Sequence, residues 1–160
     1  MPTYFVEERN FTLAMGGLTT SIFLIIGAFA QPVGGFIADK VNQLWVVIGS
    51  IFSASLILLA LNELQLGMWF TYFSLILLGF ALYISTPAAL SMVKKVSSSK
   101  GYGRAFGINF TTMAASGSIA PLVVGYLGDK FSLDFAFSLL PAFLILAGIP
   151  LFLVRNKIDL

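Results

Sequence analysis

The sequence predicts an all-α protein, a polytopic bundle of five transmembrane helices, from two observations. Of its 160 residues, 58% are hydrophobic and only 16 are charged, nine Lys or Arg and seven Asp or Glu. These charges leave five uncharged runs of 20 to 30 residues between them, and a spanning helix needs about 20 apolar residues. The composition excludes a soluble globular domain, in which about 25% of residues are charged. The lack of Cys excludes a disulfide scaffold.

The uncharged runs have the pattern of helices and not of barrel strands. In hydrocarbon a segment must satisfy its own backbone hydrogen bonds, so only helices and closed barrels span a membrane. Barrel strands alternate apolar and polar residues over about ten positions. Runs such as Leu75-Ile76-Leu77-Leu78 do not alternate, so each run is expected to be a helix.

Each run is bounded by charges or small polar residues. The first follows Glu7 and Glu8 without a basic stretch, so it is not a signal peptide. Glu63 alone separates the second run from the third, the Ser- and Gly-rich segment 97–103 precedes the fourth, and Arg155 ends the fifth. We expect an external segment, 1–13, and a five-helix lobe, 14–160, with spans at 14–38, 44–61, 66–92, 105–127 and 136–154.

The basic residues predict how the helices are oriented, because cytoplasmic loops carry an excess of Lys and Arg. Loops 39–43, 93–104 and 155–160 must share one side, and they hold seven of the nine basic residues. The N-terminus is therefore expected outside and the C-terminus in the cytoplasm, in a multi-pass protein of the inner or plasma membrane. An outside N-terminus without a signal sequence suggests that a preceding helix is missing, with 2–6 as its exit.

An internal repeat relates the first span to the fourth. A shift of 90 residues gives seven identities in 25 positions. The identical pairs are Gly17 and Gly107, Gly27 and Gly117, Ala30 and Ala120, Val33 and Val123, Gly35 and Gly125, Asp39 and Asp129, and Lys40 and Lys130. Because Asp39 is expected inside and Asp129 outside, the repeat is inverted in the membrane, as in many secondary transporters. The fold expected is thus part of an inverted-repeat six-helix lobe.

The segment Gly35-Phe36-Ile37-Ala38-Asp39-Lys40 resembles the loop motif of the major facilitator superfamily, which follows the second helix of each six-helix half. The residues after it, 42–44, depart from the motif, and the departure favours the C-terminal half. The segment 117–125 resembles the family's eleventh helix, and 2–9 resembles the end of its seventh. The resemblance therefore implies helices eight to twelve with a truncated seventh, a fragment of a C-terminal half.

The resemblance implies a gating role for Gly35, Asp39 and Lys40, because in the family this carboxylate pairs with neighbouring helix ends or basic residues. The alternative is a solvated loop charge that only sets topology. Gly125, Asp129 and Lys130 are the possible external counterparts. Small residues let helices approach closely in lipid, so helix packing is expected for four positions, Gly27, Gly34, Gly117 and Pro121.

Polar side chains within the spans are the candidates for lining a solute path. In the resembling family the eighth, tenth and eleventh helices line the central cavity, which corresponds to the first, third and fourth spans here. The candidates on them are Gln31, Tyr83, Asn109, Thr112 and Ser116. The alternative is hydrogen bonding between helices, worth about 0.6 kcal/mol on average.

The function expected from these features is secondary active transport of a small solute by alternating access, in a partial chain. The expected partners are membrane lipid, an unidentified solute and the missing N-terminal helices. An integral-membrane scaffold or assembly subunit is the alternative. Without His, Cys or acids inside the spans, no enzyme, metal site or cofactor is expected. A net charge of only +2 gives no basic face for nucleic acid.

Overall fold

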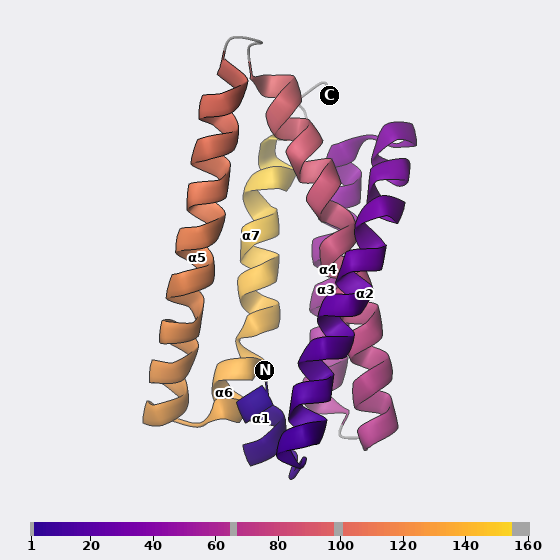
Figure 1. The fold of residues 1–160 in the computed structure, drawn as a ribbon. Coiled ribbons are helices and arrows are strands. Elements are labelled where there is room, and N and C mark those ends of the chain that lie inside the picture. Colours follow the sequence, from indigo (N-terminus) through magenta and orange to yellow (C-terminus); the bar gives the residue numbers. More distant parts are fainter. Residues whose placement is uncertain (1, 65–66, 98–100, 155–160) are drawn as a thin grey trace.

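A computed structural model describes residues 2–64, 67–97 and 101–154. Within these ranges the chain is helical apart from short connections, which confirms the all-α prediction (Figure 1). Five stretches are long and apolar enough to cross a membrane, the last formed by two successive helices. The helices are α1 (Pro2–Glu7), α2 (Leu13–Lys40), α3 (Gln43–Glu63), α4 (Met68–Val96), α5 (Tyr102–Lys130), α6 (Leu133–Ser138) and α7 (Leu140–Val154).

Helices α2 and α3 begin one residue before the predicted spans, where side-chain caps start them. Thr12 accepts a hydrogen bond from the Met15 amide and starts α2, and Asn42 accepts one from Leu44 and starts α3. Side chains of this type satisfy the free amides of a first helical turn. At its other end α2 is closed by Val41, whose N–H donates to the Ile37 carbonyl, so Asp39 and Lys40 lie in the last turn of α2 and not in a loop. The predicted start of the third span, residue 66, lies outside the described residues.

The segment 1–13 contains α1, whose Tyr4 and Phe5 are buried. A turn joins α1 to α2, and in it Asn10 adopts a φ of 54°, a conformation that Asn tolerates better than most residues.

The fifth span, expected as one helix over 136–154, is two helices that part at Leu139. Pro141 has no N–H to donate to the carbonyl of Phe137, four residues earlier, and proline breaks the helical ladder in this way. The carbonyl accepts instead from the Leu139 N–H and from Nδ2 of Asn62, the latter at 3.1 Å. A side chain of α3 thus helps to satisfy the carbonyl at the break, which position in the sequence does not reveal.

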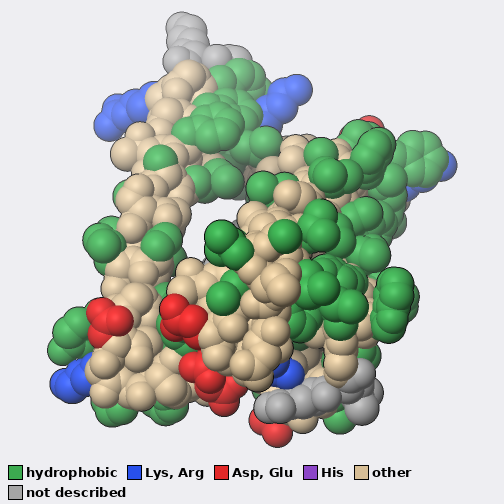
Figure 2. All heavy atoms as spheres, turned by 60° about the horizontal axis from the view of Figure 1, so that its bottom comes forward, with side chains coloured by type: hydrophobic (Ala, Val, Ile, Leu, Met, Phe, Trp, Pro, Cys, Tyr) green, Lys and Arg blue, Asp and Glu red, His purple; other side chains and the backbone are tan. Residues whose placement is uncertain are grey.

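The core lies among α1, α3, α4 and α6, and α5 contacts it through the half-buried Val124. The core cluster includes Ala54, Leu58 and Leu61 of α3, Leu75 and Leu78 of α4, and Phe137 of α6. Helix α2 packs closely along α4, and α3 packs against α4 and α7. In contrast, α5 contributes no buried residue in the part of the chain described. The space-filling view shows an opening between α5 and the other helices (Figure 2).

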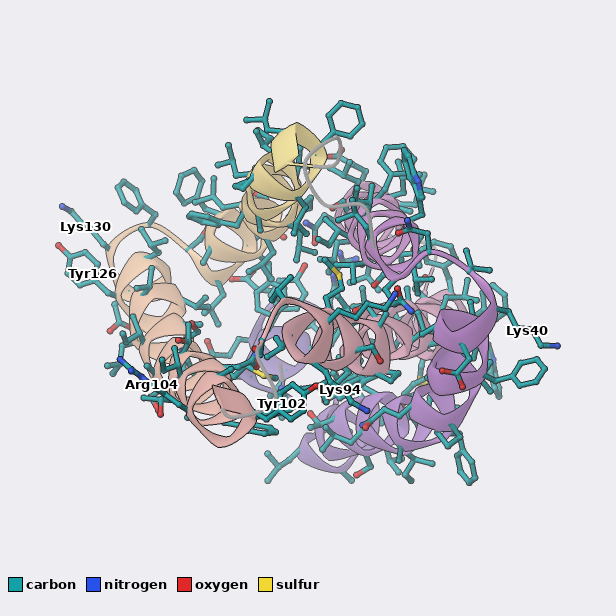
Figure 3. All side chains as sticks on the ribbon, turned by 90° about the horizontal axis from the view of Figure 1, so that it is seen from above. Lys40, Lys94, Tyr102, Arg104, Tyr126 and Lys130 are labelled. Atoms are coloured by element: carbon teal, nitrogen blue, oxygen red, sulfur yellow. The ribbon has the colours of Figure 1, made fainter. Side chains whose placement is uncertain are left out.

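Charges collect at the two ends of the bundle. One end, here the basic end, carries Lys40, Lys94, Lys95 and Arg104, of which Figure 3 labels Lys40, Lys94 and Arg104. The opposite end, here the acidic end, carries Glu7, Glu8, Glu63, Asp129 and Asp134 together with Arg9 and Lys130. Figure 2 shows acidic side chains gathered at this end. Three further basic residues assigned to the cytoplasmic side, Lys100, Arg155 and Lys157, lie outside the described residues.

The directions of the helices fit the repeat. The chain climbs α2 towards the basic end and descends α5 towards the acidic end (Figure 1). The two repeated helices therefore run in opposite directions.

Candidate functional site

The contact between α2 and α4, here the α2–α4 seam, is made by glycines. At Gly34 an added Cβ would overlap the backbone carbonyl of Ile84, and at Gly27 it would overlap the ring of Tyr83. On the facing helix, a Cβ at Gly79 would come within 2.8 Å of the Phe23 carbonyl. Ala30, between the two α2 glycines, is fully buried. Close backbone approach of this kind is how membrane helices associate without a hydrophobic drive.

Tyr83, a predicted cavity residue, lies in this seam. Its ring packs against Gly27 and meets the ring of Phe23 edge-on, with the centroids 5.6 Å apart. The side chain is only half-buried. A role in contacting solute stays a prediction.

The motif residues lie at the basic end of α2, on its exposed side. Asp39 and Lys40 are both exposed, and Lys40 Nζ lies 4.0 Å from the centre of the Phe36 ring, one turn back on its own helix. Figure 3 shows Lys40 pointing away from the bundle. A Cβ added at Gly35 would lie 4.0 Å from the Cβ of Pro87. The gating contact of Asp39 stays a prediction, because no contact of this carboxylate with a basic residue is seen within the described ranges.

Gln43 joins three helices at the basic end, and sequence reasoning missed it. Its Nε2 donates to the carbonyl of Ala38 at 2.7 Å, and its Oε1 accepts from Lys95 Nζ at 2.7 Å. The first bond satisfies a free carbonyl near the end of α2. Gln43 is buried. The sequence feature that could have indicated Gln43 is its position directly after the motif, where the residues depart from the family pattern.

The possible counterparts of the motif lie around a cavity at the acidic end. Its volume is about 590 Å³, and α1, α5, α6 and the start of α7 enclose it. Four of the predicted residues line it, Gly117, Pro121, Gly125 and Asp129, together with Tyr4 and Glu7 of α1. Lys130 is directed elsewhere, with its Nζ 5.8 Å from the ring centres of Tyr126 and Phe131.

The polar candidates of α5 do not share one cavity. Asn109 lines a space of about 320 Å³ between α4 and α5, together with Ser85, Thr86 and Met113. Its Oδ1 is buried without a hydrogen-bond partner among the described atoms. Buried polar atoms are rarely left unpaired, so Asn109 is the strongest of the candidates for contact with a solute.

The other three candidates are exposed. Thr112 donates to the carbonyl of Ile108 on its own helix at 2.9 Å, while Gln31 and Ser116 are solvent-exposed. Their predicted roles as cavity lining are untested.

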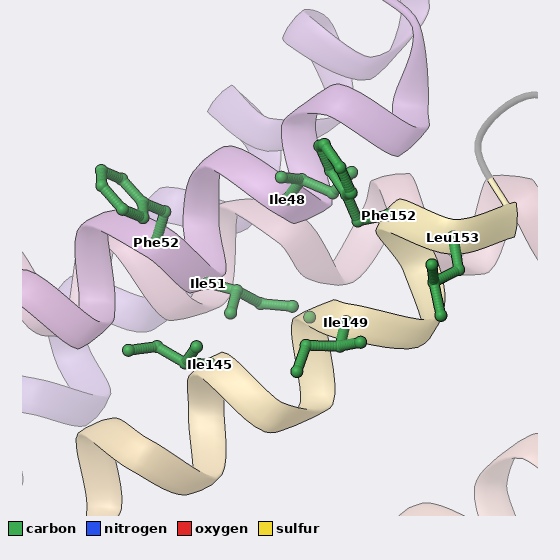
Figure 4. A pocket seen from close by; sticks show the side chains of 8 residues that line it. Ile48, Ile51, Phe52, Ile145, Ile149, Phe152 and Leu153 are labelled. Carbon is green, nitrogen blue, oxygen red and sulfur yellow. The ribbon is translucent and has the colours of Figure 1, made fainter.

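A groove on the outer side of α3 and α7 is lined by apolar residues (Figure 4). Its volume is about 260 Å³, and it lies between Ile48, Ile51 and Phe52 of α3 and Ile145 and Ile149 of α7. A polar solute would lose its hydrogen bonds to water there without replacement. The two cavities beside α5 are therefore better candidates for a solute site than this groove.

The described residues thus form a polytopic membrane bundle with cavities beside one loosely attached helix. The chain matches the family described as "Major Facilitator Superfamily" over residues 1–159. It belongs to this family of membrane transporters, which confirms the resemblance seen in the motif. The protein is accordingly an integral multi-pass membrane protein, of a transporter class and not an enzyme class.

Among curated proteins the chain is similar to transporters of nitrogen oxyanions. It is 30% identical over 155 residues to the "Probable nitrate transporter NarT" of Staphylococcus haemolyticus, covering 93% of this chain and 38% of that protein. It is 25% identical over 140 residues to the "Probable nitrate/nitrite transporter NarK2" of Mycobacterium tuberculosis, covering 88% of this chain and 35% of that protein. The chain therefore spans just over a third of the length of these relatives. No solved structure matches it.

Proposed function

We propose that the chain is the C-terminal part of a secondary active transporter that moves a small solute by alternating access. The family match over residues 1–159 is the observation that carries the proposal. In it α2 to α7 correspond to helices eight to twelve, and α1 is the end of a seventh. Preceding helices of the same transporter are the proposed partners. They would face α5, which the described helices leave exposed.

The packing supports this proposal, since alternating access needs elements that move and elements that stay together. The α2–α4 seam is the fixed element, because its helix backbones touch at Gly34 and Gly79. Helix α5 is the mobile element, because it buries no residue and has a cavity near each end. A change in its tilt would change the size of the cavity beside Asn109.

Asn109 is the residue proposed to contact the solute, and Asp39 with Lys40 is proposed to steady one of the two states. Because the interiors of the spans carry no charge, a coupling group such as an intramembrane acid would lie on the preceding helices. The names of the relatives make nitrate and nitrite the first solutes to test.

Uptake of labelled nitrate into proteoliposomes tests the proposal. A product that carries this chain and its upstream helices should show saturable uptake, and the chain alone should show none above empty liposomes. Saturable uptake by the chain alone would refute its role as one part of a transporter. A product with upstream helices that transports no solute in a broad screen would favour the scaffold alternative.

The proposed orientation has the N-terminus outside and the C-terminus in the cytoplasm. The chain has no Cys, so a single introduced cysteine is the site at which a maleimide reacts. Glu63→Cys at the acidic end and Lys94→Cys at the basic end should react with a membrane-impermeant maleimide from opposite sides, Glu63→Cys from outside. Labelling of both from one side would overturn the topology.

A further inference from the structure

Three polar side chains meet at the acidic end, outside the residues assigned to gating or solute, namely Tyr4 of α1, Arg9 just after α1 and Asp134 of α6. Arg9, just after α1, donates from Nη2 to the carbonyl of Leu61 near the end of α3 at 2.8 Å, and to that of Asn62 at 3.5 Å. It also donates to the hydroxyl of Tyr4, at 3.2 Å from Nη2 and 3.4 Å from Nε. The Tyr4 hydroxyl in turn donates to Oδ1 of Asp134 at 3.3 Å.

The charges in this network are placed where helix ends favour them. Arg9 lies at the carbonyl end of α3, where the helix dipole is negative, and Asp134 lies in the first turn of α6, where it is positive. The phenol of Tyr4 stands between the cation and the anion and bonds to both. Arg9 is half-buried and Tyr4 is 1% exposed, so breaking the network leaves buried polar groups without partners.

The network holds α6 at three points. Besides the bond to Asp134, the Tyr4 ring stacks on Phe137 with centroids 3.9 Å apart. Asn62 donates to the Phe137 carbonyl that Pro141 leaves without its helical partner. Phe137 is 5% exposed. The short helix α6 is therefore fixed to α1 and α3 by polar bonds and by an aromatic stack.

The position of α5 depends on α6. Helix α5 packs mainly on α6 and only lightly on α4. The turn between α5 and α6 is tight, with Leu133 lying against Gly128. Helix α5 has no fully buried residue, and its contact with the core cluster is made by the half-buried Val124, so the position of its acidic end depends mainly on how α6 is held.

We propose that Arg9, Tyr4, Asn62 and Asp134 form a clasp that anchors α6 and makes the acidic end of α5 a pivot. These are positioning residues, since they act through α6. The basic end of α5 is then free to move while the acidic end stays in place. The anchoring is independent of transport; only its use in a transport cycle rests on the proposed function.

Spin-label distances in the full chain, reconstituted in lipid nanodiscs, test the clasp. One label pair, at Glu63→Cys and Tyr126→Cys, measures the acidic end of α5 against α3. A second pair, at Phe29→Cys and Phe73→Cys, measures the α2–α4 seam and reports whether the bundle is folded. These last two side chains are 71% and 60% exposed, so labels there disturb little.

Tyr4→Phe removes the hydroxyl and keeps the stacking ring, and Arg9→Lys keeps the charge and loses the fork of donors. In both variants the fraction of molecules with α5 displaced should rise roughly ten-fold, the scale of a lost hydrogen bond to a charged group. The seam distance should stay unchanged. Tyr72→Phe, at a half-buried tyrosine of the same end, and Arg104→Lys, at an exposed arginine of the other end, are matched controls.

An unchanged distance between positions 63 and 126 in Tyr4→Phe would overturn the clasp. Equal broadening of both distances would also overturn it, because the network would then support the whole bundle and not α5. Uptake assays separate the two proposals. If the clasp variants displace α5 while neither the chain nor its longer product transports a solute, the clasp stands and the transport proposal fails.

Discussion

Helices α2 and α5 share a repeated sequence pattern but lie in opposite environments. Gly27 of α2 is in contact with Tyr83, whereas an added Cβ at its counterpart Gly117 would meet nothing within 4 Å. Ala30 is fully buried and its counterpart Ala120 is exposed. A glycine pattern thus indicates the capacity of a helix for close packing. Whether a helix packs closely also depends on a partner that supplies a matching surface.

The largest effect is expected at Gly34, where α2 and α4 approach most closely. In Gly34→Ala the new methyl group would overlap the Ile84 carbonyl, and backbone cannot yield as a side chain can. Overpacking costs about 1–3 kcal/mol and occasionally more, and we expect the upper part of that range. Thermal unfolding in nanodiscs measures it.

Val124 is the repeat counterpart of Gly34 and already carries a side chain. Val124 is half-buried and packs against the core cluster, so Val124→Ala removes contacts but creates no overlap. It should lower the free energy of unfolding by about 1 kcal/mol, less than Gly34→Ala. An equal loss in the two variants would mean that α5 is packed as closely as α2.

Gly27→Ala should lower the free energy of unfolding by about 1–2 kcal/mol, less than Gly34→Ala, because the Tyr83 ring can shift. Gly117→Ala should be neutral or stabilising by up to about 1 kcal/mol, since alanine favours the helix over glycine. Adding Tyr83→Leu to Gly27→Ala should recover part of the lost free energy of unfolding, because the smaller side chain leaves room for the new methyl group. Adding Tyr83→Leu to Gly34→Ala should recover none. If Gly117→Ala lowers the free energy of unfolding as much as Gly27→Ala does, α5 must have a close neighbour at Gly117.

Asn62→Ala tests how α6, and with it the acidic end of α5, is held, because it removes the side-chain donor to the Phe137 carbonyl and leaves that carbonyl the bond from the Leu139 N–H. Loss of such a bond costs about 1 kcal/mol. The distribution of distances between spin labels at positions 63 and 126 should broaden. Pro141→Ala supplies a backbone N–H four residues after Phe137. The double variant should therefore regain stability through a continuous α6–α7 helix. No recovery would show that the proline is not the cause of the break.

The smallest effect is the dependence of the clasp on pH. Burial raises the pKa of Tyr4 above its ordinary value of 10.0, the neighbouring Asp134 raises it further, and Arg9 opposes both. The folded state therefore holds this proton more tightly than the unfolded state. The stabilising contribution is complete below pH 10 and is lost as the pH rises through the folded-state pKa.

The difference in unfolding free energy between the natural protein and Tyr4→Phe should accordingly be constant from pH 7 to about 9. It should shrink only in more alkaline solution. A difference that already fell near pH 7 would place another titrating group in the clasp.

The sequence by itself determined the class of protein. Lipid requires long apolar helices, so the charge-free runs predicted five spans, and the Gly-Asp-Lys motif indicated the family that the match over 1–159 confirmed. The sequence also placed basic and acidic residues at opposite ends. These properties depend on the composition of single segments. They can therefore be predicted without knowing which segments are neighbours in the folded protein.

Only the tertiary structure decided where the helices end and which residues meet. At the break near Leu139, Asn62, 75 residues from Phe137, helps to satisfy the Phe137 carbonyl. Tyr4 meets Asp134 across 130 residues, and Gln43 rather than Asp39 bridges the basic end. Such contacts depend on the three-dimensional neighbours of each side chain. For that reason two helices with one sequence pattern acquired different surroundings.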